Sequence, residues 1–87
     1  MNIFNMLDHL SANVGILAVI PYFENDSMSV KFVDGTSAIV RPNTTAMDIY
    51  DEEGFFARTE DLEKSDEAIL SKLSAMASRA VLAPHKV

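Results

Sequence analysis

The sequence predicts a small α+β domain: a two-layer sandwich in which an antiparallel meander sheet packs with a short N-terminal helix and a long C-terminal helix. Three observations support this prediction. Apolar residues recur with helical spacing at both ends of the 87-residue chain, β-branched and alternating runs lie between them, and an Asp-Gly pair separates two of these runs. The expected order is helix, three strands, a short fourth strand and a helix, within a single domain over residues 1–87.

The first expected element is a short helix over residues 3–12. Four apolar side chains at spacings of three and four form its buried stripe: Ile3, Met6, Leu7 and Leu10. Asn2 is a suitable N-cap, and Gly15 follows the helix as a stop signal. Because about three turns of helix are unstable alone in water, this helix is expected to pack on the sheet.

Three strands are expected over residues 14–23, 28–33 and 36–41. The first run is almost continuously apolar and rich in β-branched side chains, whereas the second alternates apolar and polar residues. Asp34-Gly35, between the second and third runs, predicts a two-residue type I′ hairpin turn, which needs positive φ at both positions. An antiparallel meander is therefore expected.

The turn lengths predict which side chains share a face of this sheet. A two-residue turn sets Val30 opposite Ile39 and places both on one face. That face is expected to hold Leu17, Val19, Phe23, Met28, Val30, Phe32 and Ile39. The other face is expected to hold Val14, Ile16, Ala18, Ile20, Tyr22, Val33, Ala38 and Val40.

This distribution leaves two arrangements open. If both helices cover the first face, the second face exposes an apolar patch, which soluble monomers rarely do. If the helices lie on opposite faces, the patch is covered. The first arrangement predicts a surface for a partner or for a second copy of the chain. Five residues are the candidates for this contact: Ile16, Ile20, Tyr22, Val33 and Val40.

The segment after the third strand is harder to assign. Residues 45–53 form either a short helix, because Thr45 and Asp48 fit a capping box, or a loop. Residues 54–58 are expected to form a short edge strand with one phenylalanine on each face.

The C-terminal helix is predicted from apolar residues that hold helical periodicity up to Val81. It either runs unbroken from about residue 60 to residue 82, with Thr59 as its N-cap, or covers residues 66–82 after a single preceding turn. Pro84 prevents its continuation, so residues 83–87 are expected to be a flexible tail.

Charge is the most informative polar feature. The net charge is −6, and residues 48–67 hold nine acids and two bases, so this segment accounts for the entire excess. Such a balance argues against direct contact with nucleic-acid phosphates or membrane lipids. The segment is either a solvated face that favours solubility and the helix dipole or an acidic surface that orients a basic protein partner. The acids expected at such a surface are Asp48, Asp51, Glu52, Glu53, Glu60, Asp61 and Glu63.

No constellation for catalysis or ligand binding is recognisable in the sequence. Cysteine is absent, which excludes disulfides and thiol chemistry, and His9 and His85 have no partner at a spacing that would orient them. The acidic run at 48–53 lacks the alternate oxygen spacing of a calcium loop, and the three glycines do not form a phosphate-binding loop. We therefore expect no enzyme, no metal and no cofactor.

These features predict a non-enzymatic, acidic protein–protein interaction module. In size, acidity and lack of cysteine the chain resembles small inhibitors encoded by phages and mobile elements, including anti-CRISPR and nuclease-blocking proteins. This resemblance implies an inhibitor that occupies a basic surface of a nucleic-acid-handling protein. The alternative is a structural homo-oligomer associated through the apolar sheet face. No basic residue precedes Lys31 and the longest apolar run has 10 residues, so a protein of the cytoplasm without membrane contact is expected.

Overall fold

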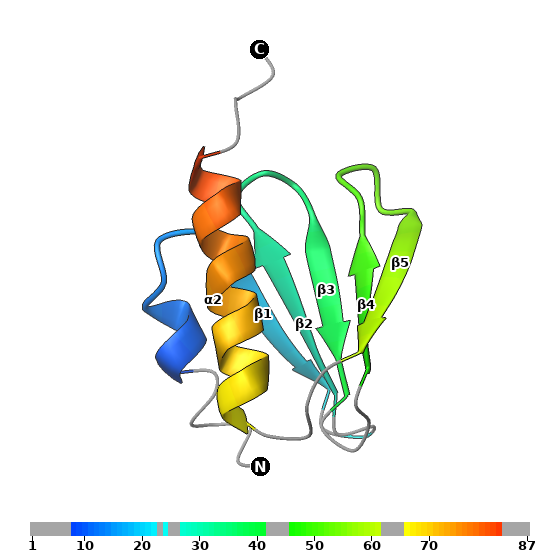
Figure 1. Ribbon diagram of the computed structural model, residues 1–87, viewed down its shortest axis with the longest axis horizontal. Coiled ribbons are helices and arrows are strands. Elements are labelled where there is room, and N and C mark those ends of the chain that lie inside the picture. Colours follow the sequence, from blue (N-terminus) through cyan, green and yellow to red (C-terminus); the bar gives the residue numbers. More distant parts are fainter. Residues whose placement is uncertain (1–7, 23, 25–26, 42–45, 62–65, 83–87) are drawn as a thin grey trace.

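The computed structural model of the protein describes residues 8–22, 24, 27–41, 46–61 and 66–82. Within them, five strands form one antiparallel meander sheet in the order β1-β2-β3-β4-β5 (Figure 1). The elements are β1 (Ile16–Tyr22), β2 (Ser27–Phe32), β3 (Ser37–Val40), β4 (Ala46–Tyr50), β5 (Phe56–Asp61) and the helix α2 (Asp66–Leu82). Residues 8–11 are the described part of the N-terminal helix. The predicted α+β class is confirmed.

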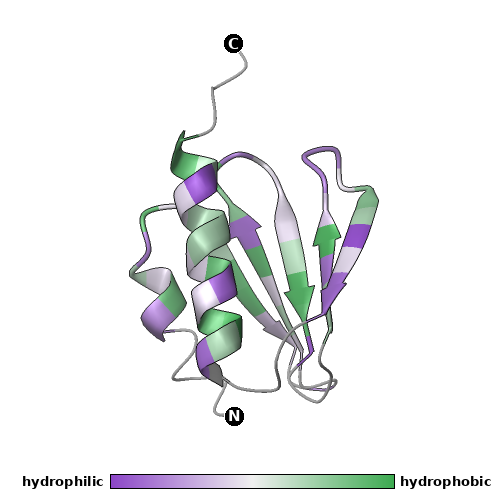
Figure 2. Ribbon diagram, viewed as in Figure 1, coloured by the Kyte–Doolittle hydropathy of each residue, from purple (hydrophilic) through white to green (hydrophobic). Residues whose placement is uncertain are grey.

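The core lies between one face of the sheet and the two helices. α2 crosses this face and the N-terminal helix lies beside it (Figure 1). β2 alternates apolar and polar residues, which Figure 2 shows as green bands between paler or purple ones, whereas β1 is apolar along most of its length. The buried apolar residues are Leu10, Met28, Val30, Phe32, Ala38, Val40, Met47, Ile49, Ile69, Leu73, Met76, Ala77 and Ala80. Because Leu10 belongs to this core, both helices cover the same face, and no described helix covers the other.

The β2–β3 hairpin has a three-residue loop instead of the predicted two-residue turn. The N–H of Phe32 donates to the carbonyl of Thr36 at 2.9 Å, so that Val33, Asp34 and Gly35 form the loop. Gly35 has the left-handed φ of 94°. The carboxylate of Asp34 accepts hydrogen bonds from the N–H and the hydroxyl of Thr36, at 2.9 and 2.6 Å. These side-chain contacts favour the longer loop, and the predicted type I′ turn is wrong.

The longer loop shifts the pairing of β2 with β3 by one residue. Val30 lies opposite Ala38, and Ser29 lies opposite Ile39. Val40 therefore points into the core, where it is 1% exposed, and Ile39 lies on the uncovered face. The predicted placement of Val40 on the uncovered face and of Ile39 in the core is wrong, because a one-residue slip exchanges the two faces of a strand.

β1 contains a bulge that no sequence pattern indicated. Ile16 lies opposite Phe32 and Ala18 lies opposite Lys31, so Leu17 is the extra residue. Ile16 packs against the core, whereas Leu17 is 70% exposed. The predicted placement of Ile16 on the uncovered face, and of Leu17 against the helices, is therefore wrong: the bulge inverts the alternation at the start of the strand.

Residues 46–50 form the strand β4, not the short helix or loop that was expected. Met47 and Ile49 point into the core, so buried and half-buried residues alternate along the segment. Asp48, which was expected to belong to a capping box, instead pairs with a residue of β3 on one side and with Thr59 of β5 on the other. Pairing and burial on both sides of the strand outweigh a local capping signal.

The fourth predicted strand exists as β5, but it continues to Asp61 and includes Thr59, which is therefore not a helix N-cap. α2 begins at Asp66 and ends at Leu82, in agreement with the second of the two predicted arrangements. The predicted turn before α2, the N-cap Asn2 and the tail at residues 83–87 lie outside the described residues.

Candidate protein-binding site

The uncovered face of the sheet is a mosaic of apolar and polar side chains and not the continuous apolar patch that was expected. On β1 it carries Ile20 and Tyr22, which are 37% and 46% exposed. Ser29 separates Ile20 from Ile39 across the sheet. The apolar side chains of this face are therefore divided between β1 on one side and Tyr50 and Phe56 on the other, with Ser29 and Ile39 between them.

The five predicted apolar contact residues are divided between three places. Ile20 and Tyr22 lie on the uncovered face, and Val33 lies in the β2–β3 loop, where it is half-exposed. Ile16 and Val40 belong to the core side of the sheet. The structure therefore does not bring these five residues together on one surface.

The predicted acidic contact residues are also dispersed. Asp48 lies on the uncovered face, where it forms an ion pair with Arg41 at 3.0 Å and accepts a hydrogen bond from the hydroxyl of Thr59 at 2.9 Å. Glu60 lies on the face that carries α2, and Asp61 is the last residue of β5. Glu63 lies outside the described residues.

Glu60 forms two ion pairs, one with Lys72 of α2 and one with Arg58 of its own strand, β5. Its carboxylate accepts hydrogen bonds from Lys72 of α2 and from Nε of Arg58, the latter at 3.0 Å. The hydrogen bond from Lys72 is the main reason why the pKa of Glu60 lies below its ordinary value of 4.5, while partial burial opposes this shift and Arg58 adds to it. Glu60 is thus engaged within the protein.

We expect the stability that Glu60 contributes to be lost in acid. Its pKa is lower in the folded state than in the unfolded state, so the contribution is full above about pH 4.5 and disappears as the pH falls through the folded-state pKa. Lys72→Met should lower the free energy of unfolding by about 0.5–1 kcal/mol at neutral pH and by less in acid. Urea unfolding of the unmodified chain and of the variant, at neutral pH and in acid, measures this difference in the free energy of unfolding. Lys31→Met, which removes an exposed lysine with no ion pair among the described residues, is the control, and an equal loss for Lys72→Met at both pH values would contradict the expectation.

Three of the predicted acids come together in the turn between β4 and β5: Asp51, Glu52 and Glu53. Oδ1 of Asp51 accepts hydrogen bonds from the N–H groups of Glu53 and Phe55, at 3.0 and 2.9 Å. The N–H of Asp51 donates to the carbonyl of Phe55 at 2.9 Å, and the N–H of Gly54 donates to the carbonyl of Asp51 at 3.0 Å. Gly54 has a φ of 88°, which side chains resist. Asp51 therefore fixes the direction in which the chain leaves the turn.

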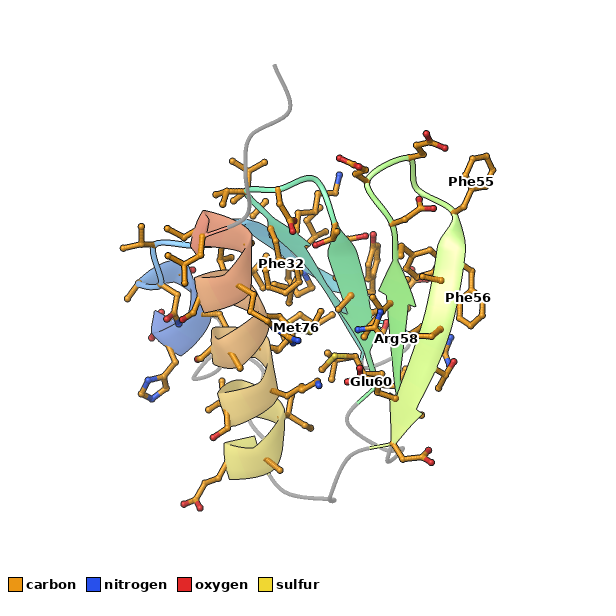
Figure 3. All side chains as sticks on the ribbon, turned by 45° about the horizontal axis from the view of Figure 1, so that its top comes forward. Phe32, Phe55, Phe56, Arg58, Glu60 and Met76 are labelled. Atoms are coloured by element: carbon orange, nitrogen blue, oxygen red, sulfur yellow. The ribbon has the colours of Figure 1, made fainter. Side chains whose placement is uncertain are left out.

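The turn presents two adjacent, exposed phenylalanines. Phe55 is 67% exposed and Phe56 is 58% exposed. Both rings project outward from β5 and away from α2 (Figure 3). Phe56 also meets Tyr50 edge to face, with ring centroids 6.0 Å apart and an interplanar angle of 76°. We call the turn and its two rings the hairpin tip, which comprises Asp51, Glu52, Glu53, Phe55 and Phe56.

Sequence reasoning did not single out the two phenylalanines, because it placed one on each face of an edge strand and left open which faces the helices cover. α2 lies over the other side of the sheet, and the described residues of β5 are exposed except for the half-buried Glu60. A signal was available: because adjacent residues of a strand point to opposite faces, one layer of helices can bury at most one ring of the pair Phe55-Phe56.

Two hollows lie elsewhere on the surface. The larger, of about 400 Å³, lies between residues 13–15 and the last turns of α2, and the exposed aliphatic side chains of Val14, Val81 and Leu82 line it. The smaller, of about 160 Å³, is lined by Asp34, Thr36, Ile49, Arg58, Met76 and Arg79. Neither lining, as far as the structure describes it, contains a histidine that would serve as a general base.

Within the described part of the chain, no three histidine, aspartate or glutamate side chains lie close enough together to hold a metal ion. None of the helices that the structure describes has both the length and the apolar character needed to cross a membrane. No protein-family model matches the sequence, and no curated protein is significantly similar to it. The hairpin tip is therefore the candidate protein-binding site.

Proposed function

We propose that this chain is a non-enzymatic protein-binding module and that the hairpin tip is its contact with the partner. The observation that carries the proposal is a pair of exposed phenylalanines on a turn held by four hydrogen bonds. Aromatic side chains supply much of the binding energy of protein interfaces. A turn that is already fixed in the free protein loses little conformational entropy when it binds.

The two rings are large enough to anchor a complex. Full burial of an exposed apolar side chain contributes roughly 1.5–3 kcal/mol. Because Phe55 and Phe56 are 67% and 58% exposed, their burial by a partner would contribute about 2–4 kcal/mol together. This free energy corresponds to a change of about 30- to 1000-fold in Kd.

The acids of the hairpin tip indicate the charge of the partner. Glu52 and Glu53 belong to the same turn as the two rings, so the complementary surface is an apolar pocket with a basic rim. Proteins that handle nucleic acids present basic grooves of this kind. An inhibitor that blocks such a groove is the more specific form of the proposal, and it is supported by the acidity of the chain.

Affinity capture tests the role of the rings. The double variant Phe55→Ser/Phe56→Ser is compared with the unmodified chain in a lysate of the organism that encodes it. Val81→Ser/Leu82→Ser, which removes two exposed apolar side chains from α2, is the matched control. We expect the unmodified chain and the control to capture a protein that the tip variant does not, with a Kd for the purified pair at least about 30-fold weaker in the tip variant. Equal capture by all three would contradict the proposal.

The salt dependence of the same complex tests the role of the acids. Glu52→Gln/Glu53→Gln should weaken binding and reduce its sensitivity to salt between about 50 and 300 mM. If binding of the unmodified chain does not change over this range, the partner surface is not basic.

The alternative function, a homo-oligomer associated through the uncovered sheet face, is supported by the exposure of Ile20 and Tyr22. Sedimentation velocity of the unmodified chain at micromolar concentration distinguishes the two proposals. A monomeric mass removes the alternative and leaves the protein-binding module.

A further inference from the structure

We infer that the outer edge of β5 accepts an extended, basic segment of the partner as a sixth strand of the sheet. This inference rests on the proposed function, since it assigns a binding mode to the surface next to the hairpin tip. The sheet has two edge strands, β1 and β5. The directions of their backbone N–H and C=O groups decide which of them is available to another strand.

The outer edge of β1 is closed to such pairing. In an antiparallel ladder, residues that bond to one neighbour alternate with residues that point to the other side. The N–H of Val33 donates to the carbonyl of Gly15 at 3.0 Å, so the odd-numbered residues of β2 face β1, and their partners in β1, such as Ile20, face β2. The backbone N–H and C=O groups of Val19 and the C=O of Pro21 therefore point away from the sheet. Pro21 has no N–H to offer, and the bulge near the start of the strand disrupts the edge further.

Among the residues that the structure describes, no strand pairs with the outer edge of β5. The N–H of Asp51 donates to the carbonyl of Phe55, so Asp51 faces β5. The backbone N–H and C=O of Ile49, two residues earlier in β4, point toward β5 as well, and those of its partner Arg58 point toward β4. The N–H and C=O of the next residue, Thr59, consequently point away from the sheet. β5 contains no proline, and its own bulge lies at Ala57, before Thr59 and Asp61.

A side-chain contact agrees with this assignment. Directly opposite residues that do not exchange backbone hydrogen bonds lie closest together in an antiparallel ladder. Thr59 lies opposite Asp48, and its hydroxyl donates to the Asp48 carboxylate at 2.9 Å. Asp61, two residues after Thr59, points outward by the same alternation. The edge therefore offers a short row of backbone groups that no strand of the sheet uses.

Charge selects the kind of segment that pairs with this edge. Residues 51–61 hold five acids and one base. A second copy of the chain would bring the same acids to the edge, so pairing of β5 with itself is opposed by repulsion. A partner segment with lysine or arginine at alternate positions has the opposite charge, and its backbone supplies the missing hydrogen bonds.

The side chains of β5 define two rows beside which the added strand would lie. Figure 3 shows Arg58 and Glu60 on the side of α2, and Phe56 away from it. Apolar residues of the added strand would pack beside Phe56, while a basic residue would lie near the exposed Asp61. The same segment can thus contact the hairpin tip and pair with the edge.

A pair of substitutions at one position separates the backbone from the side chain. Thr59→Pro removes the outward N–H but no backbone bond between β4 and β5. Thr59→Val also removes the hydroxyl but keeps the N–H, and it is the matched control. The probe is a fluorescein-labelled peptide of alternating valine and lysine, about eight residues long. Two comparison peptides carry glutamate in place of lysine, or proline in place of a central valine.

We expect the valine-lysine peptide to bind the unmodified chain and Thr59→Val with Kd values within about twofold, and Thr59→Pro at least roughly tenfold more weakly, by fluorescence anisotropy. The glutamate and proline peptides should bind weakly. Equal affinities of Thr59→Pro and Thr59→Val would overturn the inference, as would tight binding of the glutamate peptide or no binding of the valine-lysine peptide.

Amide hydrogen exchange of the unmodified chain provides a measurement that does not depend on the folding of Thr59→Pro. The valine-lysine peptide should slow the exchange of the Thr59 amide and leave that of Val19, at the other edge, unchanged. Unaltered exchange at Thr59 in the presence of saturating peptide would overturn the inference.

The outcomes also separate this inference from the proposed function. If Phe55→Ser/Phe56→Ser reduces capture of the partner and Thr59→Pro does not, the hairpin tip binds the partner and the sixth strand does not form. If neither variant affects capture, both proposals fail.

Discussion

Val40→Lys is expected to unfold the protein at room temperature. Val40 is 1% exposed and lies in β3 between Met28 and Met47 of the neighbouring strands. An ammonium group placed there has no described carboxylate partner within the core, and burying an unpaired charge costs several kcal/mol. A domain of this length has a stability of about 4–13 kcal/mol in total. Far-UV circular dichroism and a thermal melt measure the loss.

Ile39→Lys is the matched control for this substitution. Ile39 lies on the uncovered face, opposite Asp48 of β4 and only partly buried. A lysine there keeps its ammonium group in water and gains a nearby carboxylate, so we expect a loss of less than about 1.5 kcal/mol. If Ile39→Lys unfolded the protein while Val40→Lys did not, the two-residue hairpin turn and its register would be right and the observed register wrong.

The second large effect is expected for Phe32→Ala. Phe32 is among the largest fully buried side chains of the core, at 1% exposure. Its removal loses the transfer free energy of the ring and leaves a cavity under α2, which together cost about 3–5 kcal/mol. Urea unfolding should show a lower midpoint with an unchanged slope, since the same surface is exposed on unfolding.

Phe56→Ala provides the comparison, because it removes the same ring from a site that is 58% exposed. We expect it to lower the stability by less than about 1 kcal/mol, mainly through the lost contact with Tyr50. Binding of the partner should fall instead. A large loss of stability for Phe56→Ala, comparable with that for Phe32→Ala, would show that the ring belongs to the fold and would contradict its assignment to the hairpin tip.

The local patterns of the sequence were sufficient to predict the class and most of the elements. The periodicity of α2, the alternation of β2 and the Asp-Gly pair each depend on residues close together in the chain. The same patterns failed for β4, where a capping signal at Asp48 competed with a strand that is stable only because β3 and β5 pair with it on both sides.

The candidate site was predictable in its charge but not in its geometry. The acids at 51–53 were singled out from composition, and the structure places them in one turn. Asp48 and Glu60 were singled out in the same way, yet the register places them on opposite faces, each with a basic partner. The exposure of Phe55 and Phe56 depends on where α2 lies on the sheet, which no local pattern reports.

The sequence by itself determined the order of the helices, most of the strands and the turns, because these elements depend on neighbouring residues and their backbone preferences. The tertiary structure alone decided which side of each strand is buried and which edge is open. A third loop residue in the β2–β3 hairpin and one bulge in β1 were enough to exchange Val40 with Ile39 and Ile16 with Leu17. The physical reason is the two-residue period of a strand, which turns every shift of one residue into a change of face.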